Sequence, residues 1–125
     1  MKIPAKLAYD VITKHEDFKE VDVYMYDIPE DFQKETTLPI IRITEINDFT
    51  TLYASNRPNA INFTIQVDIW ANDLQEIEQY YSKLNNVFIN EGWSRTVAGT
   101  DKDPDFNSTP RLYMRFRNSQ KIDIK

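Results

Sequence analysis

Residues 61–69, INFTIQVDI, alternate apolar and polar side chains without interruption. In an extended strand this period of two places the apolar side chains on one face and the polar side chains on the other. A sheet that is covered on one face only produces such a strand, and antiparallel pairing is its usual setting. Directly afterwards, residues 72–92 change to a helical period. The strand therefore leads into a helix that is long enough to cover the sheet.

The sequence marks both ends of this helix. Asn72 or Asp73 can cap its first turn, and Gly92 stands where glycine favours the end of a helix. The apolar residues recur at helical spacing, at Leu74, Ile77, Tyr81, Leu84 and Phe88. We expect the buried core to be set by Phe63, Ile65, Val67, Ile69, Leu84, Phe88, Leu112 and Met114.

The rest of the chain supplies a second helix and further strands. A helix is predicted over residues 3–15, with Pro4 in its first turn. Strands are predicted at residues 21–28, 38–46, 93–99 and 111–118. Loops are predicted at 29–37, 47–60 and 100–110, and a flexible tail, or an arm onto a neighbour, at 119–125. The sequence thus predicts one α+β domain over residues 1–125, with a single mixed, mainly antiparallel sheet of about five strands and two helices packed on one face.

Composition narrows the class of protein. With 125 residues, 41% of them apolar, and no long apolar run, the chain is expected to form one soluble domain. Its first residues are interrupted by charge and do not read as a signal peptide, which favours the cytoplasm. The absence of cysteine excludes disulfides, thiol catalysis and the usual zinc sites, and the two glycines leave no room for a phosphate-binding loop. The single histidine, His15, is interpreted as a surface residue at a helix end.

Three aspartates, Asp101, Asp103 and Asp105, stand at alternate positions, like the first ligands of a calcium loop. Such a loop needs glycine at its sixth place and a bidentate glutamate at its twelfth, where this chain has Phe106 and Leu112. We therefore interpret the segment as a solvated acidic turn, with a weak metal site as the minor alternative. No catalytic, cofactor-binding or metal-binding residue is predicted.

Two segments are candidates for contact with another molecule. The predicted loop 47–60 is long, and loops of this length are uncommon unless they have a function. It carries the apolar residues Phe49, Leu52 and Tyr53, and also Arg57. The outward side of the strand 111–118 carries Tyr113, Arg115 and Arg117. Basic side chains interleaved with an aromatic one can meet nucleic acid, acidic residues of another protein, or only water. Because the chain has a net charge of −5, contact with another protein is favoured over contact with nucleic acid. The alternative that these side chains are only exposed to solvent is equally open.

The order of the elements and several stretches point to a known family. The stretches are FTIQVDIWANDLQEIEQYYSKLNNVFINEGW, the aspartate-rich turn DKDPDF, the aromatic strand RLYMRFR and the early strand VDVYMYDIPEDF. Over residues 8–118 the chain resembles the tail terminator proteins of long-tailed phages of Gram-positive bacteria. None of these stretches is a catalytic signature.

The resemblance implies an assembly role that needs neither catalysis nor a cofactor. Such a protein forms a homo-oligomeric ring, usually a hexamer, that caps the tail tube, stops its polymerisation and provides the docking surface for the head connector. Its partners would be the major tail tube protein and the head connector or head completion protein, with no membrane involved. The ring would be assembled in the host cytoplasm and would reside at the tail–neck junction of the virion.

Within such a ring, the resemblance gives the candidate residues their roles. The contact residues of 47–60 and 111–118 would form the subunit interface. Double-stranded DNA would pass through the central hole without specific binding, and Asp101, Asp103 and Asp105 would line that channel, because negative charge repels phosphate.

Other classes of protein stay open beside this one. Another head–tail joining or neck protein would share the same features and the same lack of motifs. A small nucleic-acid-binding module or a small enzyme is disfavoured by the acidic charge and by the missing glycine loops and cysteines.

Overall fold

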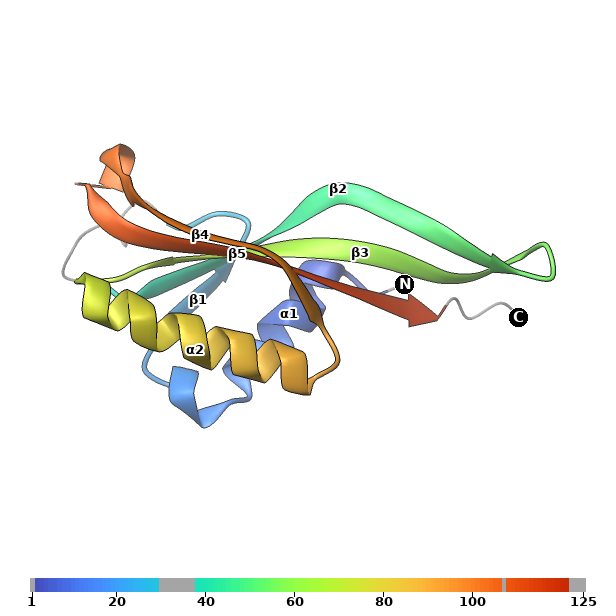
Figure 1. The fold of residues 1–125 in the computed structure, drawn as a ribbon, viewed down its shortest axis with the longest axis horizontal. Coiled ribbons are helices and arrows are strands. Elements are labelled where there is room, and N and C mark those ends of the chain that lie inside the picture. Colours follow the sequence, from blue (N-terminus) through green and yellow to red (C-terminus); the bar gives the residue numbers. More distant parts are fainter. Residues whose placement is uncertain (1, 30–37, 107, 122–125) are drawn as a thin grey trace.

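The computed structural model describes residues 2–29, 38–106 and 108–121. In chain order its elements are α1 (Pro4–Thr13), η1 (Glu16–Phe18), β1 (Asp22–Met25), β2 (Ile40–Ala54), β3 (Arg57–Trp70), α2 (Leu74–Asn90), β4 (Ser94–Asp103), η4 (Pro104–Phe106) and β5 (Thr109–Lys121) (Figure 1). The strands form one five-stranded sheet in the order β1-β2-β3-β5-β4. β1 is parallel to β2, and the other neighbouring pairs are antiparallel. The predicted α+β class with a mixed, mainly antiparallel sheet is confirmed.

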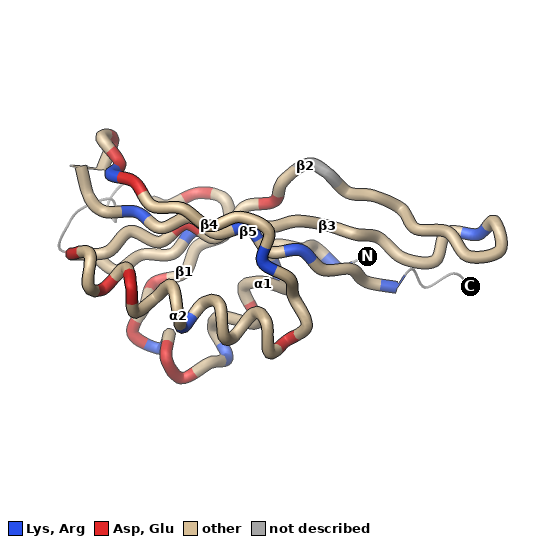
Figure 2. The backbone as a smooth tube through the Cα atoms, in the orientation of Figure 1, with Lys and Arg blue, Asp and Glu red and all other residues tan. Residues whose placement is uncertain are grey.

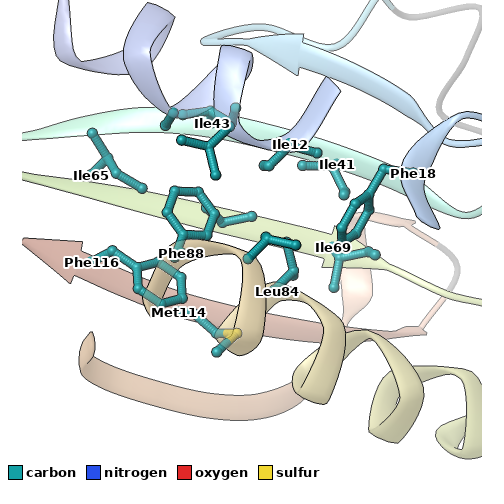
Figure 3. Packing of buried hydrophobic residues seen from close by; sticks show 14 of the residues in the cluster. Ile12, Phe18, Ile41, Ile43, Ile65, Ile69, Leu84, Phe88, Met114 and Phe116 are labelled. Carbon is teal, nitrogen blue, oxygen red and sulfur yellow. The ribbon is translucent and has the colours of Figure 1, made fainter. Parts of the chain in front are cut away.

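Both helices lie on one face of the sheet, as predicted (Figure 1). We call this the inner face and the opposite one the outer face. The core between helices and sheet brings Ile12 of α1, Phe88 of α2 and the alternating side chains of β3 together (Figure 3). Because β3 lies between β2 and β5, both of its edges are hydrogen-bonded along most of its length.

All eight residues that were predicted to set the core are at most 1% exposed: Phe63, Ile65, Val67, Ile69, Leu84, Phe88, Leu112 and Met114. The apolar stripe of α2 was predicted less well. Leu74 is 64% exposed and Tyr81 is 37% exposed, whereas Val87, which the stripe did not include, is buried. Both exposed residues lie at the edge of the helical face that contacts the sheet, where spacing alone does not decide burial.

The predicted start of α1 and both predicted ends of α2 are confirmed. Pro4 occupies the first turn of α1, where its missing N–H costs nothing. At α2 the Asp73 side chain caps the helix by accepting a hydrogen bond from the N–H of Glu76 at 2.8 Å, and the Glu76 side chain accepts one from the N–H of Asn72 at 3.0 Å. Gly92, with φ of +86°, takes the left-handed conformation that ends α2.

The prediction of an irregular loop over 47–60 is wrong. β2 continues to Ala54 and β3 begins at Arg57, so this segment is a long hairpin with a two-residue turn. Ser55 and Asn56 form the turn with φ of +52° and +63°, which is the left-handed pair that a tight hairpin of the I′ type requires. The sequence of this hairpin does not alternate apolar and polar residues, because both of its faces are exposed. The proline and the polar residues in it also favoured the prediction of a loop.

Further boundaries differ from the prediction. β1 covers Asp22–Met25 and not 21–28, and α1 covers Pro4–Thr13 and not 3–15. The predicted loop 100–110 contains the end of β4, which runs to Asp103, the short helix η4 and the start of β5 at Thr109. The predicted flexible tail begins too early, since β5 extends to Lys121 and pairs there with Ala60. Of the predicted loop 29–37, residues 30–37 lie outside the described part of the chain, as do residues 122–125.

The aromatic packing around Phe88 predicts a large loss of stability when this ring is removed. Phe88 is fully buried, stacks on Phe116 with a centroid distance of 4.3 Å and meets Trp93 edge-on at 5.3 Å. Phe88→Ala should lower the free energy of unfolding by about 3–5 kcal/mol. The adjacent Ile89 is 50% exposed, so Ile89→Ala is the matched control and should change it by less than about 0.5 kcal/mol. Urea denaturation measures both, and equal effects would contradict the assignment of the faces.

Candidate interaction surface

The outer face of the sheet carries a network of charges centred on Asp68 in β3. Asp68 is fully buried although no helix covers this face. Arg42 of β2 donates to its Oδ2 at 3.0 Å, and Arg111 of β5 and Gln66 donate to its Oδ1 at 3.3 and 3.0 Å. The two guanidinium groups therefore shield the carboxylate from water and compensate its charge. Because three donors already hold its two oxygens, this carboxylate has a structural role in fastening three strands together.

The three aspartates that were predicted to form a solvated turn are largely engaged within the chain. Asp101 accepts two hydrogen bonds from Arg111, from Nε at 2.9 Å and from a terminal nitrogen at 2.7 Å. These bonds hold the pKa of the Asp101 carboxyl below its usual value and raise the pKa of Arg111. Asp103 accepts a hydrogen bond from the indole N–H of Trp70 at 2.9 Å and another from the N–H of Asp105 at 3.0 Å.

Of this trio, Asp105 is exposed on η4, Asp103 is partly buried, and Asp101 lies in β4 rather than in a loop. Within the described residues, no three acidic or histidine side chains are grouped in a way that could hold a metal ion. His15 lies just after α1, and its Nδ1 accepts a hydrogen bond from the N–H of Asp17 at the start of η1.

Tyr113, Arg115 and Arg117 lie on the outer face of β5, as predicted, but only Arg117 is exposed. Arg115 donates to Gln66 at 2.9 Å. The ring of Tyr113 lies over Gly99 of the neighbouring strand, so closely that a β-carbon at that position would fall 2.3 Å from the Tyr113 hydroxyl oxygen. Glycine is therefore required at residue 99 for this ring to lie flat on the outer face.

The hairpin of β2 and β3 ends in a projection, and we call residues 49–60 the arm. Residues 53–59 lie beyond β5, whereas Thr50, Thr51 and Leu52 at the base pair with residues of β3 that β5 still accompanies. β5 accompanies β3 only as far as Ala60, and in Figure 1 the arm projects away from the body of the molecule. It exposes Phe49 at 44%, Leu52 at 41% and Tyr53 at 67%. Burying one such side chain contributes about 1.5–3 kcal/mol. A two-stranded hairpin is marginally stable by itself, so the arm has the properties of a surface that another chain covers.

The structure thus divides the predicted contact residues into two groups. Phe49, Leu52, Tyr53 and Arg57 share the arm, while Tyr113 and Arg115 lie within the polar outer face. Arg117 lies between the groups, where β5 runs along β3 towards the base of the arm. Sequence analysis missed the outer-face network, because Arg42, Asp68 and Arg111 are far apart in the chain and only the strand register aligns them.

A shallow groove lies between α2 and β4, at the edge of the sheet. It has a volume of about 350 Å³, and its lining includes Tyr81, Val97 and Leu112. The Arg95 guanidinium lies over the Tyr81 ring, 5.2 Å from its centroid, and donates a hydrogen bond to the Tyr81 hydroxyl. The groove is therefore bordered by an exposed aromatic ring on one side and by the backbone of an edge strand on the other.

The contact between Arg111 and Asp101 predicts a stability contribution that disappears in acid. Because the pKa of Asp101 is depressed in the folded state, the contact stabilises the fold above the usual pKa of 3.8 and loses its effect as pH falls through the lowered value. The Asp101 side chain is 42% exposed, so Asp101→Asn should cost at most about 1 kcal/mol at pH 7. The difference from the wild type should shrink between pH 5 and about pH 2, as urea denaturation can show.

The control for this prediction is Asp105→Asn, which changes an exposed carboxylate nearby. Its effect on the free energy of unfolding should stay within about 0.5 kcal/mol. A cost of Asp101→Asn that is the same at pH 7 and in acid would contradict the role assigned to this carboxylate.

Comparison with known proteins places the chain in a family. A family described as "Protein of unknown function (DUF806)" matches residues 2–118. No curated protein matches the chain. In the described residues, neither helix is long and apolar enough to span a membrane. The description of the family assigns no function, so the relation to phage tail terminators stays a prediction. Because the match covers nearly the whole sequence, the chain belongs to the DUF806 family.

Proposed function

We propose that this protein is a phage tail terminator, which forms a ring on the last ring of the tail tube, stops polymerisation of the tube and provides the docking surface for the head connector. The observation that carries the proposal is the arm, a projecting hairpin end that exposes Phe49, Leu52 and Tyr53 and is two-stranded over residues 53–59. The class of assembly comes from the sequence stretches that resemble tail terminators. The arm supports an assembly role because a two-stranded hairpin is only marginally stable in water by itself and exposed apolar side chains favour contact with another chain.

The outer face supports a role without catalysis. Its carboxylates at Asp68, Asp101 and Asp103 accept hydrogen bonds from arginine or tryptophan side chains of the same chain. A general acid or base needs a carboxyl group that can exchange its proton with a substrate, and these three are engaged in holding strands together. We therefore interpret the face as a rigid support for the arm.

The distribution of charge supports passage of DNA without binding. The chain has a net charge of −5. Figure 2 shows basic residues towards the end that carries the arm, and acidic residues interspersed with basic ones at the opposite end, around the start of α2 and the connection from β4 to β5. Of the three aspartates proposed to line a channel, Asp101 and Asp105 are exposed, and because Arg111 holds Asp101, Asp105 on η4 is the leading candidate. Repeated around a ring, such a charge repels DNA within a Debye length of about 10 Å.

Substitutions in the arm test the proposed function. In a phage that carries this gene, Phe49→Ser combined with Tyr53→Ser should give tails of excessive length that are not joined to heads, because the tube is no longer capped. Electron microscopy of lysates measures tail length and head attachment. Leu74→Ser is the matched control, since it removes an equally exposed apolar side chain from α2 and should leave tails normal.

Each outcome of this experiment separates the proposals. Tails of normal length joined to heads would contradict an assembly role for the arm. Tails of normal length without heads would instead identify the second candidate, a head–tail joining protein, which the same exposed arm would also fit. The purified variants should melt within a few degrees of the wild type, because both side chains are exposed.

Reversal of the charge of Asp105 on η4 tests whether this residue faces the proposed DNA channel. Asp105→Lys should retain tail length and head joining but lower infectivity and slow the release of DNA, because a cation facing the channel holds phosphate. Asp105→Asn is the control and should have a smaller effect, since it removes repulsion without adding attraction. Unchanged infectivity and DNA release in Asp105→Lys particles would place this residue outside the channel.

A further inference from the structure

We propose that the arm of one copy adds its β2 strand to the outer edge of β4 in a second copy, so that the two sheets become continuous. This inference rests on the proposed function, because it names the contact by which copies of the chain would join into a ring. Four features of the described residues support it. They are the unpaired edges of β2 and β4, the absence of charged residues from these edges, the opposite directions of the two strands, and the groove between α2 and β4.

The first feature is the position of the two strand edges. β4 is the last strand in the sheet order, and no described strand lies beside its outer edge over Ser94–Asp103. On the other side of the sheet, β1 accompanies β2 only as far as Ile43, so no described strand lies beside the outer edge of β2 at residues 51–54. Each copy therefore offers one strand edge of each kind, on opposite sides of its sheet.

The second feature is the composition of these edges. Exposed edges are usually protected by charged side chains or proline, which discourage pairing with another chain. Residues 51–54 of the arm, TLYA, and residues 97–100 of β4, VAGT, have neither. The other strand of the arm carries Arg57 and Pro58, and proline lacks the N–H that a ladder needs. The β2 side of the arm is therefore the side suited to pairing.

The third feature is the direction that the fold imposes. β2 is antiparallel to β3, β3 to β5 and β5 to β4, so β2 runs opposite to β4 within one copy. A second copy placed beside β4 with its inner face on the same side thus brings its β2 antiparallel to β4. This contact joins two different surfaces of the chain, and such a head-to-tail contact generates a ring when its rotation closes.

The fourth feature is the groove between α2 and β4. Thr51 pairs with Ile61, whose side chain lies on the inner side of β3 together with that of Phe63, so Thr51 lies on the inner side of the arm. The groove lies on the inner side of β4, bordered by Tyr81 and Leu112. Once the sheets are continuous, Thr51 is on the side of the groove that Tyr81 and Leu112 border.

Cysteine pairs test this contact directly, because the natural chain has no cysteine. Thr51→Cys is combined in turn with Ala98→Cys, Thr100→Cys and Lys102→Cys, whose side chains share the inner side of β4. Directly paired residues lie within the Cα distance of about 4.4–6.8 Å that a disulfide needs. At least one combination should give a ladder of covalent multimers on a non-reducing gel after mild oxidation, both in the purified protein and in assembled tails.

Two controls define the geometry. Thr51→Cys with Val97→Cys places the thiols on opposite sides of the joined sheet and should give no ladder. Mixing the single variants Thr51→Cys and Thr100→Cys should stop at a covalent dimer. A dimer from Thr51→Cys alone, which would show arm-to-arm contact, or no crosslink from the three combinations in either preparation, would overturn the inference.

Failure of this inference can be told apart from failure of the proposed function. If the crosslinks are absent but the arm variants give overlong tails, the arm contacts another tail protein and the terminator role stands. If the crosslinks form but the arm variants leave tails normal and joined to heads, the copies associate through β4 and the terminator role is wrong.

Discussion

The contact of Asp68 with Arg42 and Arg111 is the interaction on which the outer half of the structure depends. It lies at the centre of the sheet and ties β2, β3 and β5 together on the face without helices. Removing one partner of a buried ion pair leaves a charge that the fold must accommodate at high cost. The inner face is held by apolar packing, whereas the outer face is held by this network, which extends through Arg111 to Asp101 in β4, and by a small apolar cluster of Ile40, Trp70 and Phe106.

A sheet supported in this way can carry a long hairpin beyond its own edge. β3 is anchored on both sides, by the aromatic core on the inner face and by Asp68 on the outer face, and the arm is its continuation. Rigidity at the base of the arm reduces the entropy that is lost when the arm meets a partner. On the outer face Asp68, Asp101 and Arg115 have hydrogen-bond partners within the chain, although the buried Nε of Arg42 has none among the described residues, while the arm exposes apolar side chains.

The same arrangement explains how an acidic protein can hold several arginines on one face of its sheet. Several arginines of the outer face are neutralised locally, as Arg111 is by Asp68 and Asp101. Figure 2 shows basic residues beside the arm and, at the opposite end, acidic residues interspersed with basic ones.

The sequence by itself determined the elements whose pattern is local. The alternation over 61–69 and the helical stripe that follows fixed the inner face and its core from Phe63 to Met114, because a buried face leaves its period in the chain. The arm left no such pattern, since both of its faces are exposed and its pairing joins residues across a turn. Likewise, the sequence pattern predicts that Asp68 faces solvent. In the structure the register of three strands brings Arg42 and Arg111 beside it. Only the tertiary structure decided these two features, because strand pairing depends on contacts between distant segments that no local period records.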